Sequence, residues 1–138
     1  MKRKVFLGFL AGSAFSLSLS PFDFWMVSFV SPAVLYLLTR DGSVSAAISI
    51  FYSFTLGTFL FGVHWIFFSI NDYGHASIFL SGGLVLLFVV LYSLIILPGS
   101  FIYARFYRRS DNLAMLSFIS VWVISEWIRS WFLTGFPW

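Results

Sequence analysis

Glu126 and Arg129 are the residues whose types and spacing point most directly to chemistry. They are three positions apart in an apolar, tryptophan-rich run over residues 122–133. Side chains at this spacing on a helix can meet. Charged groups at membrane depth are costly, so they are usually paired and usually functional. Two interpretations stay open: a polar anchor beneath a substrate portal, or a structural ion pair inside an aromatic belt. We favour the structural pair, because a buried pair needs no catalytic role.

Residues 134–138, with the sequence Thr-Gly-Phe-Pro-Trp, predict an exit from this helix. Gly135 can adopt a positive φ after the last turn, and Pro137 stops the helix from continuing. Phe136 and Trp138 would then hold their rings at headgroup level, where amphipathic rings are favoured. The alternative is a mobile arm over a lipid.

His64, Asp72 and His75 form a conceivable zinc site. No HExxH or paired-cysteine spacing supports this site, and the chain contains no cysteine. We therefore predict no metal site and no cofactor, and expect a histidine that is hydrogen-bonded among the helices. The sequence also lacks a phosphate-binding loop, a serine elbow and a carboxylate pair suited to acid–base catalysis.

Composition sets the fold class. The 138 residues are 60% hydrophobic and only 9% charged, whereas soluble domains carry about 25% charged residues. The apolar runs do not alternate as the strands of a membrane barrel do. We therefore predict an all-α, polytopic bundle of transmembrane helices. The net charge of +3 is spread over several loops, so it gives no reason to expect nucleic acid as a partner.

The apolar runs predict about five membrane spans within a single domain over residues 1–138. The spans are residues 5–20, 24–39, 44–70, 78–103 and 113–133. The first two would reach about 24 Å at 1.5 Å per residue, less than the ~30 Å hydrocarbon core, so we expect a tight hairpin with local thinning. A cleaved signal peptide over residues 5–20 is the alternative for the first span.

Basic residues predict the orientation of these spans. All of them except Arg129 fall on one side of a five-span path: Lys2, Arg3, Lys4, Arg40, Arg105, Arg108 and Arg109. The positive-inside rule then places the N-terminus in the cytoplasm and Trp138 on the opposite side.

Small residues recur every fourth position in two of the spans. The first stripe is Gly8, Gly12, Ser16 and Ser20, and the second is Ser45, Ser49, Ser53 and Gly57. Small residues at this spacing let helix backbones approach closely, so we predict that both stripes are packing faces. Changes at Phe9 or Phe54 should be milder than changes at the glycines if those rings face lipid. Pro98-Gly99 should kink or loosen the fourth span.

Three segments in order resemble the N-terminal membrane region of bacterial apolipoprotein N-acyltransferases. They are residues 11–25, residues 57–74 with the sequence His64-Trp65, and residues 122–138 with Glu126-Trp127-Ile128-Arg129 and the Gly135-Phe136-Pro137-Trp138 turn. The resemblance implies an enzyme of the bacterial inner membrane. That enzyme transfers an acyl chain from phospholipid to the α-amino group of the N-terminal diacylglyceryl-cysteine of a lipoprotein.

The resemblance also implies a Glu-Lys-Cys triad in a nitrilase-like periplasmic domain, where the cysteine forms a thioester and so divides the transfer into two steps. This chain departs from that pattern because it has no cysteine, and we expect the nitrilase-like domain to be missing. No catalytic residue can be assigned. Gly135, Phe136, Pro137 and Trp138 match a loop that the resemblance places beside the lipid and lipoprotein entry.

We therefore interpret the chain as an N-terminal fragment that supplies membrane anchoring and part of the lipid-access surface, and that is inactive alone. The implied partners are membrane phospholipid and, through the missing domain, diacylated apolipoprotein. The alternatives are a non-enzymatic scaffold or carrier module, and a split enzyme whose catalytic domain is a separate chain. The sequence leaves the origin of the truncation, the acyl-donor preference and the oligomeric state open.

Overall fold

A computed structural model of the chain describes residues 1–106 and 110–132, which form helices with no strand among them. The helices are α1 (Lys2–Phe15), α2 (Val27–Thr39), α3 (Val44–Gly62), α4 (Trp65–Phe68), α5 (Ile78–Leu94), α6 (Ile96–Phe106) and α7 (Asp111–Arg129), with a 3₁₀ turn η1 (Ser16–Ser18) and a π-helical turn η2 (Ser69–Tyr73). This all-helical fold agrees with the predicted fold class.

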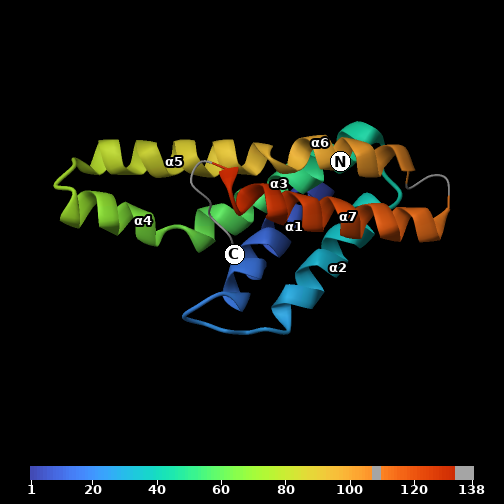
Figure 1. Cartoon of the computed structure of the whole chain (residues 1–138), viewed down its shortest axis with the longest axis horizontal. Coiled ribbons are helices and arrows are strands. Elements are labelled where there is room, and N and C mark those ends of the chain that lie inside the picture. Colours follow the sequence, from blue (N-terminus) through green and yellow to red (C-terminus); the bar gives the residue numbers. More distant parts are fainter. Residues whose placement is uncertain (107–109, 133–138) are drawn as a thin grey trace.

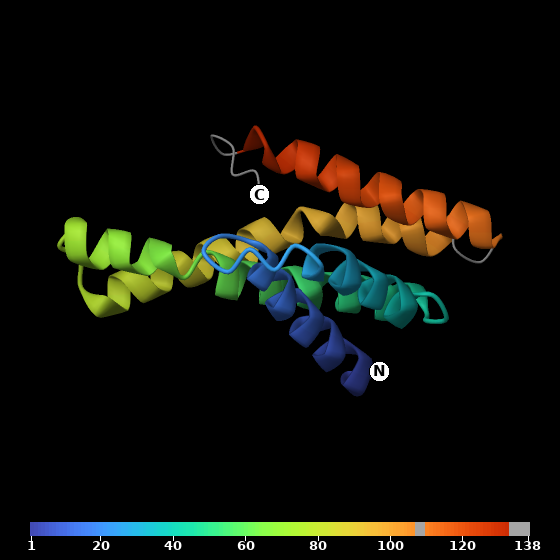
Figure 2. The ribbon, with the colours of Figure 1, turned by 90° about the horizontal axis from the view of Figure 1, so that it is seen from below.

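Helix α3 is the centre of the bundle, because α1, α2, α5 and α6 all pack against it. Its buried rings Phe51 and Phe54 meet Tyr103 of α6 and Phe118 of α7 in the main core. A second cluster around Phe59 and Tyr92 joins the end of α3 to α5. At one end of the molecule the hairpin of α4 and α5 extends beyond the other helices (Figures 1 and 2).

Helices α1 and α3 cross at the small-residue stripes, as predicted. A Cβ atom added at Gly12 would lie 1.8 Å from the Phe54 carbonyl oxygen, and one added at Gly57 would lie 2.3 Å from the Phe9 carbonyl oxygen. Ser53 Oγ also donates to the Val5 carbonyl across this contact, at 2.8 Å. Ser20, the last member of the first stripe, and Ser45, the first member of the second, are exposed. The contact between α1 and α3 therefore does not extend to these two residues.

Helices α5 and α6 are two parts of one long segment, broken at Ile95. Proline lacks an N–H and clashes with the carbonyl of the residue four positions earlier, and for Pro98 that residue is Leu94, the last of α5. The interruption of the helix at Ile95 agrees with the prediction that Pro98-Gly99 kinks or loosens this span. Beside it, Gly99 lets α6 approach α7, because a Cβ there would lie 2.7 Å from Val121 Cγ1.

Each predicted span contains a helix, but the bounds differ. By length and composition, two helical segments of the described chain could cross a membrane: Val44–Gly62 and Ile78–Phe106. The count of five spans therefore stays a prediction. The third predicted span is interrupted at Val63 and His64, after which α4 and η2 continue in a new direction.

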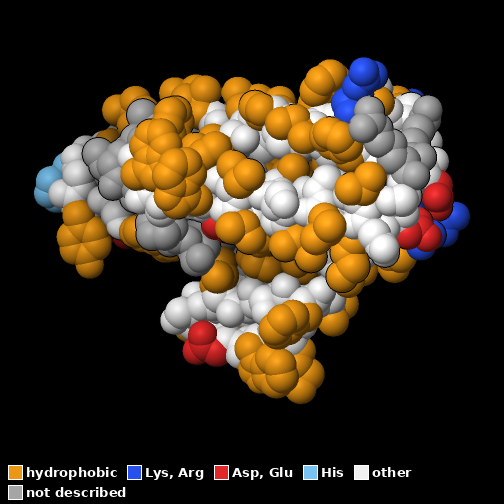
Figure 3. Space-filling model, turned by 45° about the vertical axis from the view of Figure 1, so that its right-hand side comes forward, with side chains coloured by type: hydrophobic (Ala, Val, Ile, Leu, Met, Phe, Trp, Pro, Cys, Tyr) orange, Lys and Arg blue, Asp and Glu red, His pale blue; other side chains and the backbone are white. Residues whose placement is uncertain are grey.

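Basic residues gather at the end opposite the α4–α5 hairpin. Lys4 Nζ of α1 donates to the Leu38 carbonyl of α2 at 3.3 Å. Arg40, just after α2, forms an ion pair with Asp111 at the start of α7, at 3.2 Å. On the face seen in Figure 3, hydrophobic side chains are spread along the surface between the basic end and a histidine at the other end. This arrangement is typical of helices that meet lipid along their sides.

Candidate functional site

Helix α7 carries the two charges that the sequence singled out. Ser110 caps its first turn, with the side chain accepting a hydrogen bond from Leu113 N at 3.2 Å. The buried residues of α7 recur every three or four positions and face the bundle: Ala114, Phe118, Val121, Ser125 and Arg129. Helical periodicity therefore turns Arg129 into the interior, on the same face as apolar residues.

Arg129 and Glu126 form an ion pair between Nη2 and Oε1. The Arg129 side chain is 6% exposed and that of Glu126 is 31% exposed, so the cation is buried while the carboxylate reaches the surface. The Arg129 guanidinium also lies over the ring of Phe59 on α3, with Cζ 5.4 Å from the centroid. A cation within about 6 Å of a ring face is attracted by the ring quadrupole. The Nε atom of Arg129 is buried and has no hydrogen-bond partner among residues 1–106 and 110–132.

Aromatic rings surround this pair from several helices. Trp122, one turn before Glu126, packs edge-on against Phe15 of α1 and Phe54 of α3, at centroid distances of 5.6 and 5.8 Å. Trp127 and Trp131 contact one another at 5.7 Å on the exposed side. The pair thus lies between a buried ring cluster and an exposed one, at the end of α7 away from the basic residues.

Tyr92 links the end of α7 to α5, because its hydroxyl donates to the Phe132 carbonyl at 3.0 Å. Sequence reasoning missed Tyr92 and Phe59 as members of this site. Neither has a motif, and both lie far from Arg129 in the chain. Their only sequence signal is that they are aromatic residues within apolar runs, which describes many other positions of this chain.

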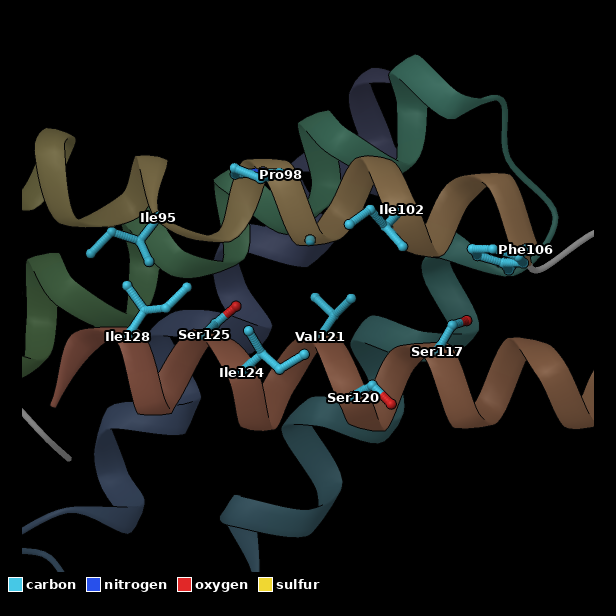
Figure 4. Close-up of a pocket in the computed structure, with 11 residues that line it drawn as sticks. Ile95, Pro98, Ile102, Phe106, Ser117, Ser120, Val121, Ile124, Ser125 and Ile128 are labelled. Atoms are coloured by element: carbon cyan, nitrogen blue, oxygen red, sulfur yellow. The ribbon is translucent and has the colours of Figure 1, made fainter.

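An apolar groove of about 360 Å³ runs between α6 and α7 (Figure 4). Ile95, Pro98 and Ile102 line one wall, and Ile124 and Ile128 line the other. A second, small cavity of about 20 Å³ lies beside the ion pair. Its lining includes Phe59 and Arg129.

The other sequence-predicted residues are placed differently. His64 Nδ1 is 2.7 Å from the Phe61 carbonyl oxygen, within hydrogen-bond distance, and the histidine itself is exposed. In the described ranges, no three or more His, Asp or Glu residues gather closely enough to hold a metal ion. Gly135, Phe136, Pro137 and Trp138 lie outside the described residues.

The described residues form a helical bundle with many exposed apolar side chains and a buried cation, a class suited to a lipid environment. Comparison with known proteins identifies its family. Residues 11–138 match the family model described as apolipoprotein N-acyltransferase N-terminal domain. The chain belongs to this family, as the resemblance in the sequence indicated.

Relatives named apolipoprotein N-acyltransferase match nearly the whole chain. The one from Pseudomonas syringae pv. tomato is 40% identical over 134 residues, which are 96% of this chain and 26% of the relative. The one from Azotobacter vinelandii is 38% identical over 134 residues, with the same coverage. The one from Vibrio parahaemolyticus is 32% identical over 142 residues, covering 100% of this chain and 27% of the relative. The chain thus spans about a quarter of the length of these relatives.

Proposed function

We propose that this chain acts as the membrane part of an apolipoprotein N-acyltransferase. In this proposal it anchors the enzyme and forms part of the surface by which phospholipid and diacylated apolipoprotein reach the catalytic residues. The observation that carries the proposal is the family match over residues 11–138, the N-terminal domain of that family. Two segments apolar and long enough to cross a membrane add support.

The proposed reaction moves an acyl chain from phospholipid to the α-amino group of the N-terminal diacylglyceryl-cysteine. A thioester route needs a thiolate nucleophile, and these 138 residues include no cysteine. The proposed Glu-Lys-Cys triad would therefore have to lie outside them. The part assigned to this chain is to position helix α7, whose end leads into the candidate access residues 134–138.

The proposed location is the bacterial inner membrane, with the basic end of the bundle in the cytoplasm and the end of α7 toward the periplasm. Reporter fusions at Asp41, Asp72, Ser110 and Trp138 test this orientation. Cytoplasmic signals are expected at Asp41 and Ser110, and periplasmic signals at Asp72 and Trp138. A periplasmic signal at Ser110 would contradict the orientation.

A chimera tests the function. The matching N-terminal segment of the Pseudomonas syringae relative is replaced by this chain, and acylation of a diacylated lipoprotein peptide is followed by mass spectrometry. The chimera should transfer the acyl group, and this chain alone should not. Turnover by the chain alone would overturn the thioester route, whereas a folded but inactive chimera would count against the assigned role.

A further inference from the structure

The loop between α1 and α2 carries exposed aromatic rings, and the hairpin that it closes is short compared with the thickness of a bilayer. Phe22, Phe24, Trp25 and Met26 are each more than half exposed. In a water-facing loop such a set would be costly, because apolar side chains gain from leaving water. These rings therefore point to a lipid contact.

The depth of the loop follows from helix lengths. Lys4 Nζ and the Leu38 carbonyl are hydrogen-bonded, so the basic ends of α1 and α2 lie at one level. From there α2, with its 13 residues, rises about 20 Å at 1.5 Å per residue. The hydrocarbon core is about 30 Å thick, which leaves the loop roughly 10 Å below the far boundary, and any tilt lowers it further.

The neighbouring helices α5 and α6 together are long enough to cross the whole hydrocarbon core. The segment Ile78–Phe106 has 29 residues, or about 43 Å at the same rise. Figures 1 and 2 show the α1–α2 loop well short of the end that α4 and α5 form. One side of the bundle is therefore much shorter than the other along the same direction.

Most backbone N–H groups of the loop form hydrogen bonds within the loop itself, which suits an environment poor in water. The N–H groups of Leu19, Phe22, Asp23, Phe24, Trp25, Val27 and Ser28 all donate to carbonyls of Ser16–Trp25. The hydroxyls of Ser18 and Ser28 donate to the carbonyls of Phe15 and Trp25, at 2.7 and 2.6 Å. Internal hydrogen bonds of this kind are what lipid demands of a backbone.

Asp23 limits how deep the loop can go. Its side chain is exposed, and no ion pair of this residue is found within the described chain. An unpaired carboxylate in hydrocarbon is costly, so the lipid headgroups must reach Asp23. A short hydrophobic segment is accommodated by thinning of the bilayer around it.

We propose that the α1–α2 loop is a membrane-inserted surface whose partner is the lipid leaflet facing it. The rings of Phe24 and Trp25 lie among the upper acyl chains, and the leaflet is drawn down around the short hairpin to meet them. This inference rests on the membrane location in the proposed function and not on acyl transfer, so its failure would leave the chimera result intact.

Site-directed nitroxide labels test the proposal in the full chain, reconstituted in lipid nanodiscs. The native chain has no cysteine, so each single-cysteine variant carries one label. Trp25→Cys and Phe24→Cys report on the loop, and Tyr73→Cys, in the α4–α5 hairpin, is the control. Labels at Trp25 and Phe24 should collide severalfold less with a water-soluble nickel complex, and more with oxygen, than the label at Tyr73. Nickel accessibility equal to that at Tyr73 at both loop positions would overturn the proposal.

Bilayer thickness separates a thinned leaflet from a loop that is merely submerged. The same labels are measured in lipids with 14-carbon and with 18-carbon chains. If the leaflet follows the loop, protection of the Trp25 label from nickel stays the same in both. Protection that rises in the thicker bilayer would overturn the drawn-down leaflet.

Discussion

Replacing Gly12 by alanine should separate the two central helices. The added Cβ would lie 1.8 Å from the Phe54 carbonyl oxygen, and ordinary contact begins at 3.4 Å, so α1 must move by about 1.6 Å. The obstacle is backbone and cannot rotate away. Overpacking of this kind costs about 1–3 kcal/mol.

The same shift breaks a hydrogen bond. Thr58 Oγ1 lies 3.1 Å from the Gly12 carbonyl oxygen and also 3.1 Å from the Phe54 carbonyl oxygen of its own helix. The hydroxyl therefore keeps a partner within α3, and losing the bond to Gly12 removes at most about 1 kcal/mol. The higher helix propensity of alanine stabilises the folded chain by roughly 1 kcal/mol and offsets part of this cost. The net expectation is therefore a loss of about 2 kcal/mol in the free energy of unfolding.

Gly82→Ala is the matched control, since a Cβ at Gly82 of α5 would meet nothing within 4 Å. It should be neutral or slightly stabilising. Both variants are compared by reversible unfolding of the chain in mixed micelles, with helicity as the signal. A Gly12→Ala chain as stable as the Gly82→Ala chain would refute the argument that α1 and α3 are held at backbone contact.

Three further changes probe the site at the end of α7. Glu126→Gln should destabilise the chain by on the order of 2 kcal/mol, less than the cost of breaking a fully buried pair, and the double variant with Arg129→Met should recover most of this loss in the same unfolding assay. Tyr92→Phe removes the hydrogen bond to the Phe132 carbonyl, worth about 1 kcal/mol, and should speed amide exchange at the end of α7, while overall helicity stays unchanged. In the active chimera, Trp138→Ala should lower acylation severalfold; full activity would remove the access role assigned to that ring.

Features set by neighbours in sequence could be predicted from the sequence. Pro98 must disturb the carbonyl four residues before it, and the helix breaks there. The glycine stripes also gave the correct packing face, because residues four apart share one side of a helix. The condition attached to Phe54 was not met: it is 1% exposed and lies in the core. A ring beside a packing stripe can turn toward a third helix, and no local pattern shows whether such a helix is present.

The candidate site divides in the same way. The spacing of Glu126 and Arg129 indicated that they can meet, and they form an ion pair. Phe59 and Tyr92 reach the site only because α3 and α5 pack beside α7. Partners of this kind depend on how three helices are arranged, and an apolar sequence is compatible with many arrangements.

Arg129 restricts how α7 can be positioned along the neighbouring helices. An apolar face such as that of α7 can slide along its neighbours by a helical turn at modest cost, because one aliphatic contact replaces another. A buried cation resists such a slide through its partner on another helix: Glu126 lies on α7 and would move with Arg129, whereas the ring of Phe59 on α3 stays in one place. We infer that Arg129 fixes the register of α7 against α3, a role for which buried polar groups are well attested. The register in turn sets the height at which α7 ends.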